Sequence, residues 1–158
     1  MKEEKILNRQ KIYLDTSVIG GCFDDEFKKW SNNLVKDIKS GLFIPVLSEV
    51  VSSEIETAPE RIRMKYSEIL GYDAIFLEIN DEAVLLARKY QERGILPEKF
   101  FEDGLHIALA TINNIDLLVS WNFKHIVRFD KIRHFNAINM ETGYKTIEIY
   151  SPMEVTNG

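Results

Sequence analysis

Three acidic residues stand in apolar surroundings, where a carboxylate needs a partner. Asp15 follows the apolar run at 12–14, Glu54 lies among apolar residues with helical spacing, and Asp103 opens the stretch DGLHIALA. Carboxylates gathered in one crevice repel one another unless a cation neutralises them. Hard oxygen ligands favour Mg²⁺ or Mn²⁺ over zinc, and such an ion suits hydrolysis of a phosphodiester. We therefore predict Asp15 and Asp103 as metal ligands, with Glu54 binding through a water or positioning the attacking one.

Asp15 and Glu54 each have a plainer interpretation. Asp15 is followed by Thr16 and Ser17, and these three residue types all cap helices. Glu54 lies four residues after Val50, within the apolar stripe of a predicted helix. An acid on that inward face is also explained by a buried ion pair with a lysine or arginine.

Asp103 begins a helix so apolar that it must be largely enclosed. Gly104 weakens a helix by roughly 1 kcal/mol relative to alanine, which indicates close packing against a neighbour. His106 lies one turn later on the same side, where it either orients Asp103 or is a hydrogen-bonded packing residue.

A further apolar run ends in LLVSWNF, so Ser120 and Asn122 reach the same edge of the predicted sheet as Asp15. Asn122 offers a ligand oxygen without a negative charge, and we include it among the catalytic candidates. Candidate substrate-binding residues flank these positions: Thr16, Ser17, Ser120, Lys124, His125 and Arg128.

A cluster of basic residues follows Asn122 despite a net charge of -5 for the whole chain. Such a patch suits an RNA backbone, although a solvated surface explains it equally well. Aromatic residues that are interleaved with it either stack on unpaired bases or pack in the core: Trp121, Phe123, Phe129 and Phe135.

The elements that must position these residues are short apolar runs alternating with segments of helical periodicity. The runs predict strands at 11–14, 42–47, 74–79, 116–120 and 146–150. The helical segments are 27–39, 48–58, 60–70, 81–93, 98–113 and a weaker one at 131–141. Alternation of this kind predicts a parallel sheet covered on both faces, with ligands beyond the carboxyl ends of its strands.

Composition fits a soluble globular protein. Of the 158 residues, 45% are hydrophobic and 28% charged, which is too apolar for a disordered chain. The single cysteine, Cys22, cannot form an internal disulfide, which suits a reducing compartment, and we expect a cytoplasmic protein. The charged N-terminal segment lacks a secretory signal, and no run approaches the ~20 apolar residues that span a bilayer. No linker divides the chain, so we expect one domain over 1–158 with a core at about 11–155.

Four fragments in this order resemble the PIN-domain nucleases, in particular the VapC-type toxins of type II toxin-antitoxin pairs. They are YLDTSVI with Asp15, the S-x5-E spacing from Ser48 to Glu54, EDGLHIALA with Asp103, and LLVSWNFKHI followed by NMETGY. The resemblance implies a three-layer α/β/α sandwich around a parallel sheet of about five strands. It also implies cleavage of single-stranded RNA with Mg²⁺ or Mn²⁺, a small antitoxin partner and a homodimer.

The chain departs from the family pattern at Asn122, where many members have an aspartate. The site is therefore one negative charge poorer, which puts a second metal and full activity in doubt. Asp116 lies at the opposite end of the same predicted strand and does not compensate, while Asp24 and Asp25 are solvated loop charges in their plainer interpretation.

Two alternatives remain at this point. A catalytically degenerate PIN domain that binds RNA or protein fits the loss of charge at Asn122. A phosphatase resembling the haloacid dehalogenases, or a phospho-accepting receiver domain, also depends on an aspartate, but Ser17 occupies the second acidic position of the D-x-D motif and neither class explains Glu54.

Overall fold

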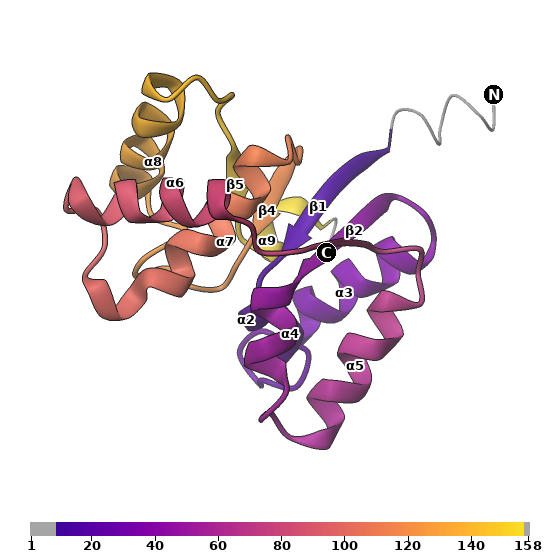
Figure 1. Cartoon of the computed structure of the whole chain (residues 1–158). Helices are drawn as coiled ribbons and strands as arrows, with labels where there is room; N and C mark the ends of the chain where they lie inside the picture. Colours follow the sequence, from indigo (N-terminus) through magenta and orange to yellow (C-terminus); the bar gives the residue numbers. More distant parts are fainter. Residues whose placement is uncertain (1–8, 157–158) are drawn as a thin grey trace.

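The computed structural model describes residues 9–156, which form a parallel sheet with helices on both faces (Figure 1). The predicted features of segment 1–8 lie outside the described residues. The strands are β1 (Gln10–Leu14), β2 (Phe43–Ser48), β3 (Ile75–Leu77), β4 (Leu117–Val119) and β5 (Glu148–Tyr150). They lie in the order β3-β2-β1-β4-β5, and every neighbouring pair is parallel. The predicted three-layer α/β/α fold with about five strands is confirmed.

The helices connect the strands in chain order. After β1 come α2 (Thr16–Gly21) and α3 (Lys28–Lys39), and after β2 come α4 (Glu49–Ile55) and α5 (Glu60–Leu70). After β3 come α6 (Asp81–Glu92), the 3₁₀ turn η1 (Glu98–Phe100) and α7 (Phe101–Ile112). The last two are α8 (Phe129–Glu141), before β5, and α9 (Pro152–Val155) at the end of the described chain.

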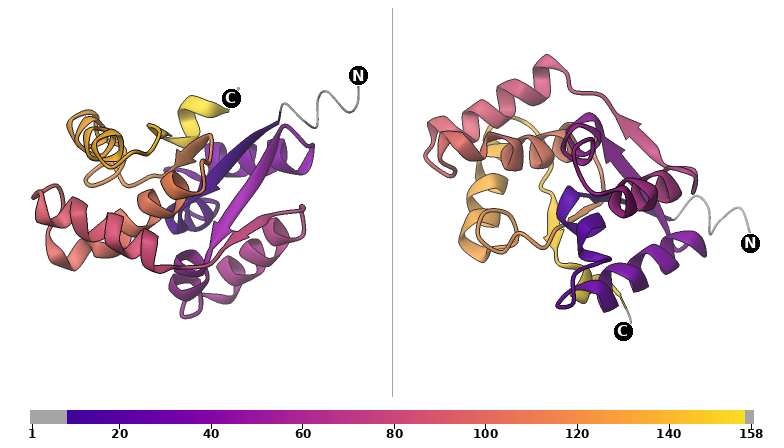
Figure 2. Two further views of the ribbon diagram at one scale, coloured as in Figure 1. Left: turned by 45° about the horizontal axis from the view of Figure 1, so that its top comes forward. Right: turned by 90° about the horizontal axis from the view of Figure 1, so that it is seen from below.

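The two helical layers differ in the part of the chain from which they come. On one face α3 contacts α5 and α9, so that the C-terminal helix lies beside the N-terminal third of the chain (Figure 2). On the other face α6 packs against α7 and α8. Helix α4 bridges the layers, because it contacts both α2 and α7. None of the described helices is long and apolar enough to cross a membrane.

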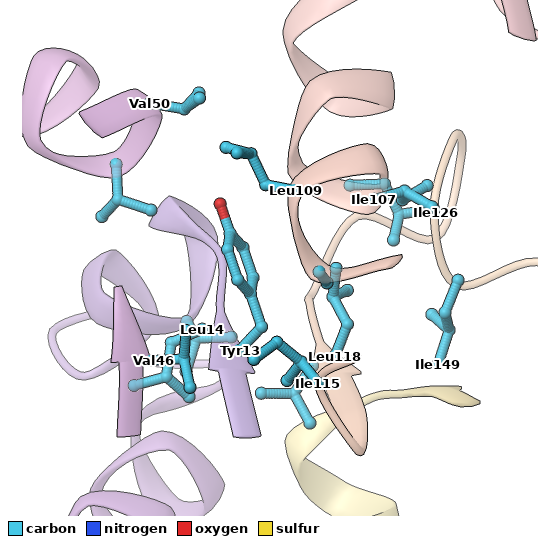
Figure 3. Close-up of a cluster of buried hydrophobic side chains, with 14 of the residues drawn as sticks. Tyr13, Leu14, Val46, Val50, Ile107, Leu109, Ile115, Leu118, Ile126 and Ile149 are labelled. Carbon is cyan, nitrogen blue, oxygen red and sulfur yellow. The ribbon is translucent and has the colours of Figure 1, made fainter. Parts of the chain in front are cut away.

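The central strands are apolar because both of their faces are covered. Ile12, Tyr13 and Leu14 of β1 have no exposed surface, and all of β4 is buried. Side chains from the sheet, α4 and α7 form one continuous core cluster (Figure 3). Tyr13 contributes a hydroxyl to this cluster, and the hydroxyl points away from β1 toward α4 and α7.

The predicted elements are all present, but the sequence patterns missed two short helices. Helices α2 and α9 span only 6 and 4 residues, too few to show a helical periodicity. The outer strands β3 and β5 are also shorter than the apolar runs that predicted them. Turns at Gly41, Gly94 and Gly143 separate neighbouring elements, and φ is +88°, +76° and +91° there, a region that favours glycine.

Candidate active site

The carboxyl ends of β1, β2 and β4 meet at one edge of the sheet, because the strands are parallel and adjacent. Asp15 directly follows β1, Ser48 ends β2, and Ser120 directly follows β4. The backbone N–H of Asp15 donates to the carbonyl oxygen of Val119 over 3.3 Å, which keeps Asp15 level with the end of β4. Residues from three distant parts of the chain therefore lie together at this edge of the sheet.

Asp15 is almost completely enclosed, with 4% of its surface exposed. Its Oδ1 accepts a hydrogen bond from the Ser17 hydroxyl over 2.6 Å, and its Oδ2 accepts one from Ser120 over 2.5 Å. Burial raises the pKa of Asp15 in spite of these donors. Oδ1 also accepts from the backbone N–H of Val18, so Asp15 is the N-cap of α2, as its plainer interpretation predicts.

Asp103 lies in the first turn of α7 and is partly buried. Its one described side-chain partner is Asn122, whose Nδ2 donates to Oδ2 over 3.3 Å. Burial raises the pKa of Asp103 to about 6, and the negative charges of Asp15 and Glu54 act in the same direction. The charges of Asp15 and Glu54 therefore act on Asp103, although the three acids come from different elements.

Gly104 lies where α7 packs against α6. A Cβ built on Gly104 would stand 3.4 Å from a methyl group of Leu96 and 3.5 Å from the ring of Tyr90, which is ordinary van der Waals contact. The close packing predicted from this glycine is therefore present.

Glu54 differs from the prediction that it faces inward among the apolar residues of α4. Val50 and Val51 are buried, but 37% of the Glu54 side chain is exposed, because the residue lies at the margin of the apolar stripe. Its partners are also not the lysine or arginine of the plainer interpretation. Oε1 accepts a hydrogen bond from the Thr16 hydroxyl over 3.0 Å and one from Nε2 of His106 over 2.8 Å.

These donors decide the ionisation of Glu54. Partial burial acts to raise its pKa, but the hydrogen bond from His106, the His106 charge and the hydroxyl of Thr16 together lower it. Glu54 is therefore an ionised carboxylate at neutral pH.

His106 does not orient Asp103, one of the two roles that we considered for it. It is 2% exposed, and its ring bonds to Glu54 through Nε2 and to the Tyr13 hydroxyl through Nδ1 over 2.6 Å. His106 is thus a hydrogen-bonded core residue, as in the second interpretation, but one of its bonds reaches a candidate site acid.

The three hydroxyl residues proposed to bind substrate are already engaged with the acids. Thr16 bonds to Glu54, whereas Ser17 and Ser120 enclose Asp15. Ser17 and Ser120 also accept hydrogen bonds from the backbone N–H groups of Trp121 and Asn122, each over 2.9 Å. The structure thus assigns them the role of fixing Asp15, and their contact with a substrate stays a prediction.

Asn122 holds the segment after β4 as well as Asp103. Its Oδ1 accepts hydrogen bonds from the backbone N–H groups of Lys124 over 3.2 Å and His125 over 2.9 Å. An asparagine serves both roles at once, because its side chain has an acceptor and a donor.

Basic residues do gather around His125, next to Asn122. Burial lowers the pKa of His125, and the positive charges of Lys124, Lys131, Arg128 and Lys99 lower it further. Neither ring nitrogen of His125 has a hydrogen-bond partner among the described residues, and the ring lies against that of Phe100 with 4.0 Å between the centroids. Lys124 is exposed, while Arg128 pairs with Asp130.

The nearby aromatic residues divide into two kinds. Trp121 and Phe135 are 5% and 0% exposed, so they are core residues, and Trp121 stacks on Phe27 with 4.1 Å between the ring centroids. Phe123 and Phe129 are 49% and 76% exposed and remain available to a ligand.

The other acids considered are exposed or have partners outside the site. Asp24 and Asp25 are exposed, and Asp25 pairs with Lys28. Asp116 accepts a hydrogen bond from the backbone N–H of Lys11 over 2.7 Å, at the opposite end of the sheet.

The side chains of Asp15 and Asp103 suit a hard divalent cation, because their donor atoms are carboxylate oxygens. Asp15 and Asp103 are also the two acids whose pKa is raised, so a cation beside them would relieve a cost of burial. Between residues 9 and 156, however, there is no group of three or more His, Cys, Asp or Glu side chains arranged to hold a metal ion. The side chain of Glu54 is bonded to His106, so the fitting ligands are two carboxylates, and a shared three-acid site stays a prediction.

Sequence reasoning missed Tyr13 and underestimated Ser48. Tyr13 was counted only as an apolar strand residue, although a fully buried tyrosine requires a partner for its hydroxyl. The spacing of Ser48 to Glu54 gives no sign of the partners of the Ser48 hydroxyl. In the structure its hydroxyl contacts the Tyr13 hydroxyl over 2.7 Å and caps α4.

Comparison with known proteins shows the fold. A chain of VapBC2 from Rickettsia felis, crystallised with a DNA fragment from the promoter, aligns with a TM-score of 0.56 and 14% identity over 90% of this chain and 98% of that one. VapC20 of Mycobacterium tuberculosis, a toxin that cleaves the sarcin-ricin loop, aligns with a TM-score of 0.57 and 13% identity over 87% of this chain and 98% of that one. No family model matches the sequence, and no curated protein matches it. The chain thus has the PIN-like fold of the VapC structures, which confirms the predicted architecture.

Proposed function

We propose that this protein is a metal-dependent endoribonuclease that cleaves single-stranded RNA, with Mg²⁺ or Mn²⁺ bound by Asp15 and Asp103. The observation that supports it most is that these two acids, 88 positions apart by their numbers, lie at the carboxyl edge of the sheet with raised pKa values. The fold shared with VapC structures, one of them of an RNA-cleaving toxin, supports the same class of activity.

Each part of the site has a role in this proposal. The cation would activate a water and stabilise charge on the scissile phosphate. Ser17 and Ser120 hold the Asp15 carboxylate in one orientation. Glu54, ionised at neutral pH, positions the attacking water or binds the cation through a water. Asn122 fixes Asp103, and the segment that follows presents Lys124 and Arg128 to the RNA backbone, with the buried His125 beside them.

The structural similarity to the VapC structures also motivates a proposal about the biological role of the protein. We propose that the protein is the toxin of a type II pair, acts in the cytoplasm as a homodimer, and is silenced by a small antitoxin. A gene for a small protein immediately upstream, whose product copurifies with this chain, is the expected observation. A chain that purifies alone and does not slow growth when expressed would contradict the toxin role.

The direct test of the proposal is cleavage of single-stranded RNA in the presence of Mn²⁺. The wild-type protein should cleave, and Asp15→Asn and Asp103→Asn should not. Glu102→Gln is a matched control, because Glu102 is exposed in the same first turn of α7. Unchanged cleavage in the two aspartate variants would refute the assignment.

Two observations favour the alternative of a binding module that does not cleave RNA. Asn122 donates a hydrogen bond to Asp103, and no cluster of three metal-binding side chains exists among the residues in view. Calorimetry separates the two functions. RNA binding without binding of Mn²⁺ would favour the module, whereas Mn²⁺ binding that depends on Asp103 would count against it.

A further inference from the structure

A chain of buried hydrogen bonds runs behind the candidate site and ends on Glu54. The Ser48 hydroxyl contacts the Tyr13 hydroxyl over 2.7 Å, and the Tyr13 hydroxyl contacts Nδ1 of His106 over 2.6 Å. On the other side of the ring, Nε2 of His106 contacts Oε1 of Glu54 over 2.8 Å. Ser48, Tyr13 and His106 are all buried, whereas Glu54 reaches the surface.

This chain joins the three elements from which the site acids come. Tyr13 lies in β1, two residues before Asp15, and Ser48 is the N-cap of α4, which contains Glu54. His106 lies in α7, one turn after Asp103. Figure 3 shows the Tyr13 hydroxyl pointing from β1 into the space between α4 and α7.

The direction of the last hydrogen bond follows from the chemistry of its partners. The ionised carboxylate of Glu54 only accepts hydrogen bonds, so Nε2 of His106 must donate. Nδ1 either accepts from the Tyr13 hydroxyl or, in a protonated ring, donates to it. Because Nε2 carries a proton in both states, His106 holds Glu54 whatever its charge.

We propose that His106 is a positioning residue of the proposed nuclease. It fixes the carboxylate of Glu54 through Nε2, while Tyr13 fixes the ring through Nδ1. The inference rests on the proposed function, in which Glu54 positions the attacking water or binds the cation through a water. A glutamate has three rotatable side-chain bonds, and 37% of this one is exposed. Without His106, only the hydroxyl of Thr16 would restrain it.

The hydrogen bond itself is tested in the metal-free protein by NMR of ¹⁵N-labelled histidine. Nε2 of His106 should be protonated, and its signal should move in Glu54→Ala. A ring with a bare Nε2, or a signal that does not respond to Glu54→Ala, would overturn the proposal. This measurement needs no activity, so it stands even if the protein cleaves no RNA.

Two matched substitutions separate positioning from packing. In His106→Gln the amide lies at the distance of Nε2 along the side chain and can still donate to Glu54. In His106→Asn it lies at the distance of Nδ1 and reaches only the Tyr13 side. We expect kcat to fall roughly 10- to 100-fold in His106→Asn, as for partners that orient metal-site residues, with KM for RNA little changed. His106→Gln should recover most of the loss.

The same two variants in a Glu54→Ala background complete the test. If His106 acts through Glu54, neither substitution should lower kcat further there. A further loss in that background, or equal kcat for His106→Gln and His106→Asn, would show a merely structural role. A wild-type protein without any cleavage would instead refute the proposed function, so the two failures are distinguishable.

Discussion

Glu54 and Asp103 are both partly buried carboxylates of the candidate site, yet they are in opposite electrostatic states. Two donors from the protein, His106 and Thr16, lower the pKa of Glu54 against the effect of burial. Asp103 has one longer hydrogen bond from Asn122, and burial raises its pKa to about 6. Hydrogen bonds from the protein therefore stabilise the ionised form of Glu54, whereas the ionised form of Asp103 lacks comparable stabilisation.

The difference indicates where a cation is needed most. A cation that binds beside Asp103 and Asp15 stabilises their ionised forms, which burial makes unfavourable. Glu54 gains less, because its hydrogen bonds would have to be shared or broken. The comparison therefore predicts unequal roles for the three acids.

The largest expected effect is on the cleavage of RNA by variants of Asp103 and Glu54. Asp103→Asn should lower kcat on the order of 10³-fold or more, because loss of a metal ligand removes several kcal/mol of transition-state stabilisation. Glu54→Gln should lower it roughly 10- to 100-fold, as expected for a residue that orients a water. Single-turnover cleavage of a labelled RNA at saturating Mn²⁺ measures both rates. An equal loss in the two variants, or a larger loss in Glu54→Gln, would contradict the unequal roles of Asp103 and Glu54.

A smaller effect is expected when a charge is added next to Asp103. Asn122→Asp removes the hydrogen bond to Asp103 and places a second negative charge beside it. The metal-free protein should lose stability, while Mn²⁺ should bind roughly fivefold more tightly, since a new ion pair near the surface is worth about 1 kcal/mol. Thermal unfolding with and without Mn²⁺ measures both changes. An unaltered thermal shift would mean that no cation lies near Asn122.

The smallest effect concerns the pH dependence of stability without metal. The pKa of Asp103 is raised in the folded state, so its protonated form favours folding. That contribution is complete below about pH 4, the unfolded pKa, and is lost as the pH rises through about 6. Relative to wild type, Asp103→Asn should therefore gain about 1 kcal/mol of unfolding free energy between pH 4 and pH 7, after allowance for solvent screening.

Urea unfolding at a series of pH values measures this difference, and Glu102→Gln is again the control. A gain of the same size in Glu102→Gln, or none in Asp103→Asn, would show that Asp103 is not a strained charge.

The sequence predicted the sheet because its strands are continuous apolar runs between helices, and parallel strands place their carboxyl ends together. Asp15 and Ser120 were found for that reason. Gly104 and the apolar stretch after it likewise indicated the close contact between α7 and α6.

The sequence could not show which partner each acid has. Glu54 and His106 are 52 positions apart, and Tyr13 and His106 are 93 apart, so the hydrogen bonds between them exist only in the folded chain. The helical spacing around Glu54 predicted an inward face, but α4 ends at Ile55, and at its last turn the side chain reaches solvent. Periodicity gives the face of a helix, whereas the depth of a side chain depends on what packs against it.

The most direct measurement is calorimetric titration of the metal-free protein with Mn²⁺ at neutral pH. We predict one binding event in the wild-type protein, which is lost in Asp103→Asn and only weakened in Glu54→Gln. Binding that survives in Asp103→Asn, or no binding in the wild-type protein, would contradict this prediction.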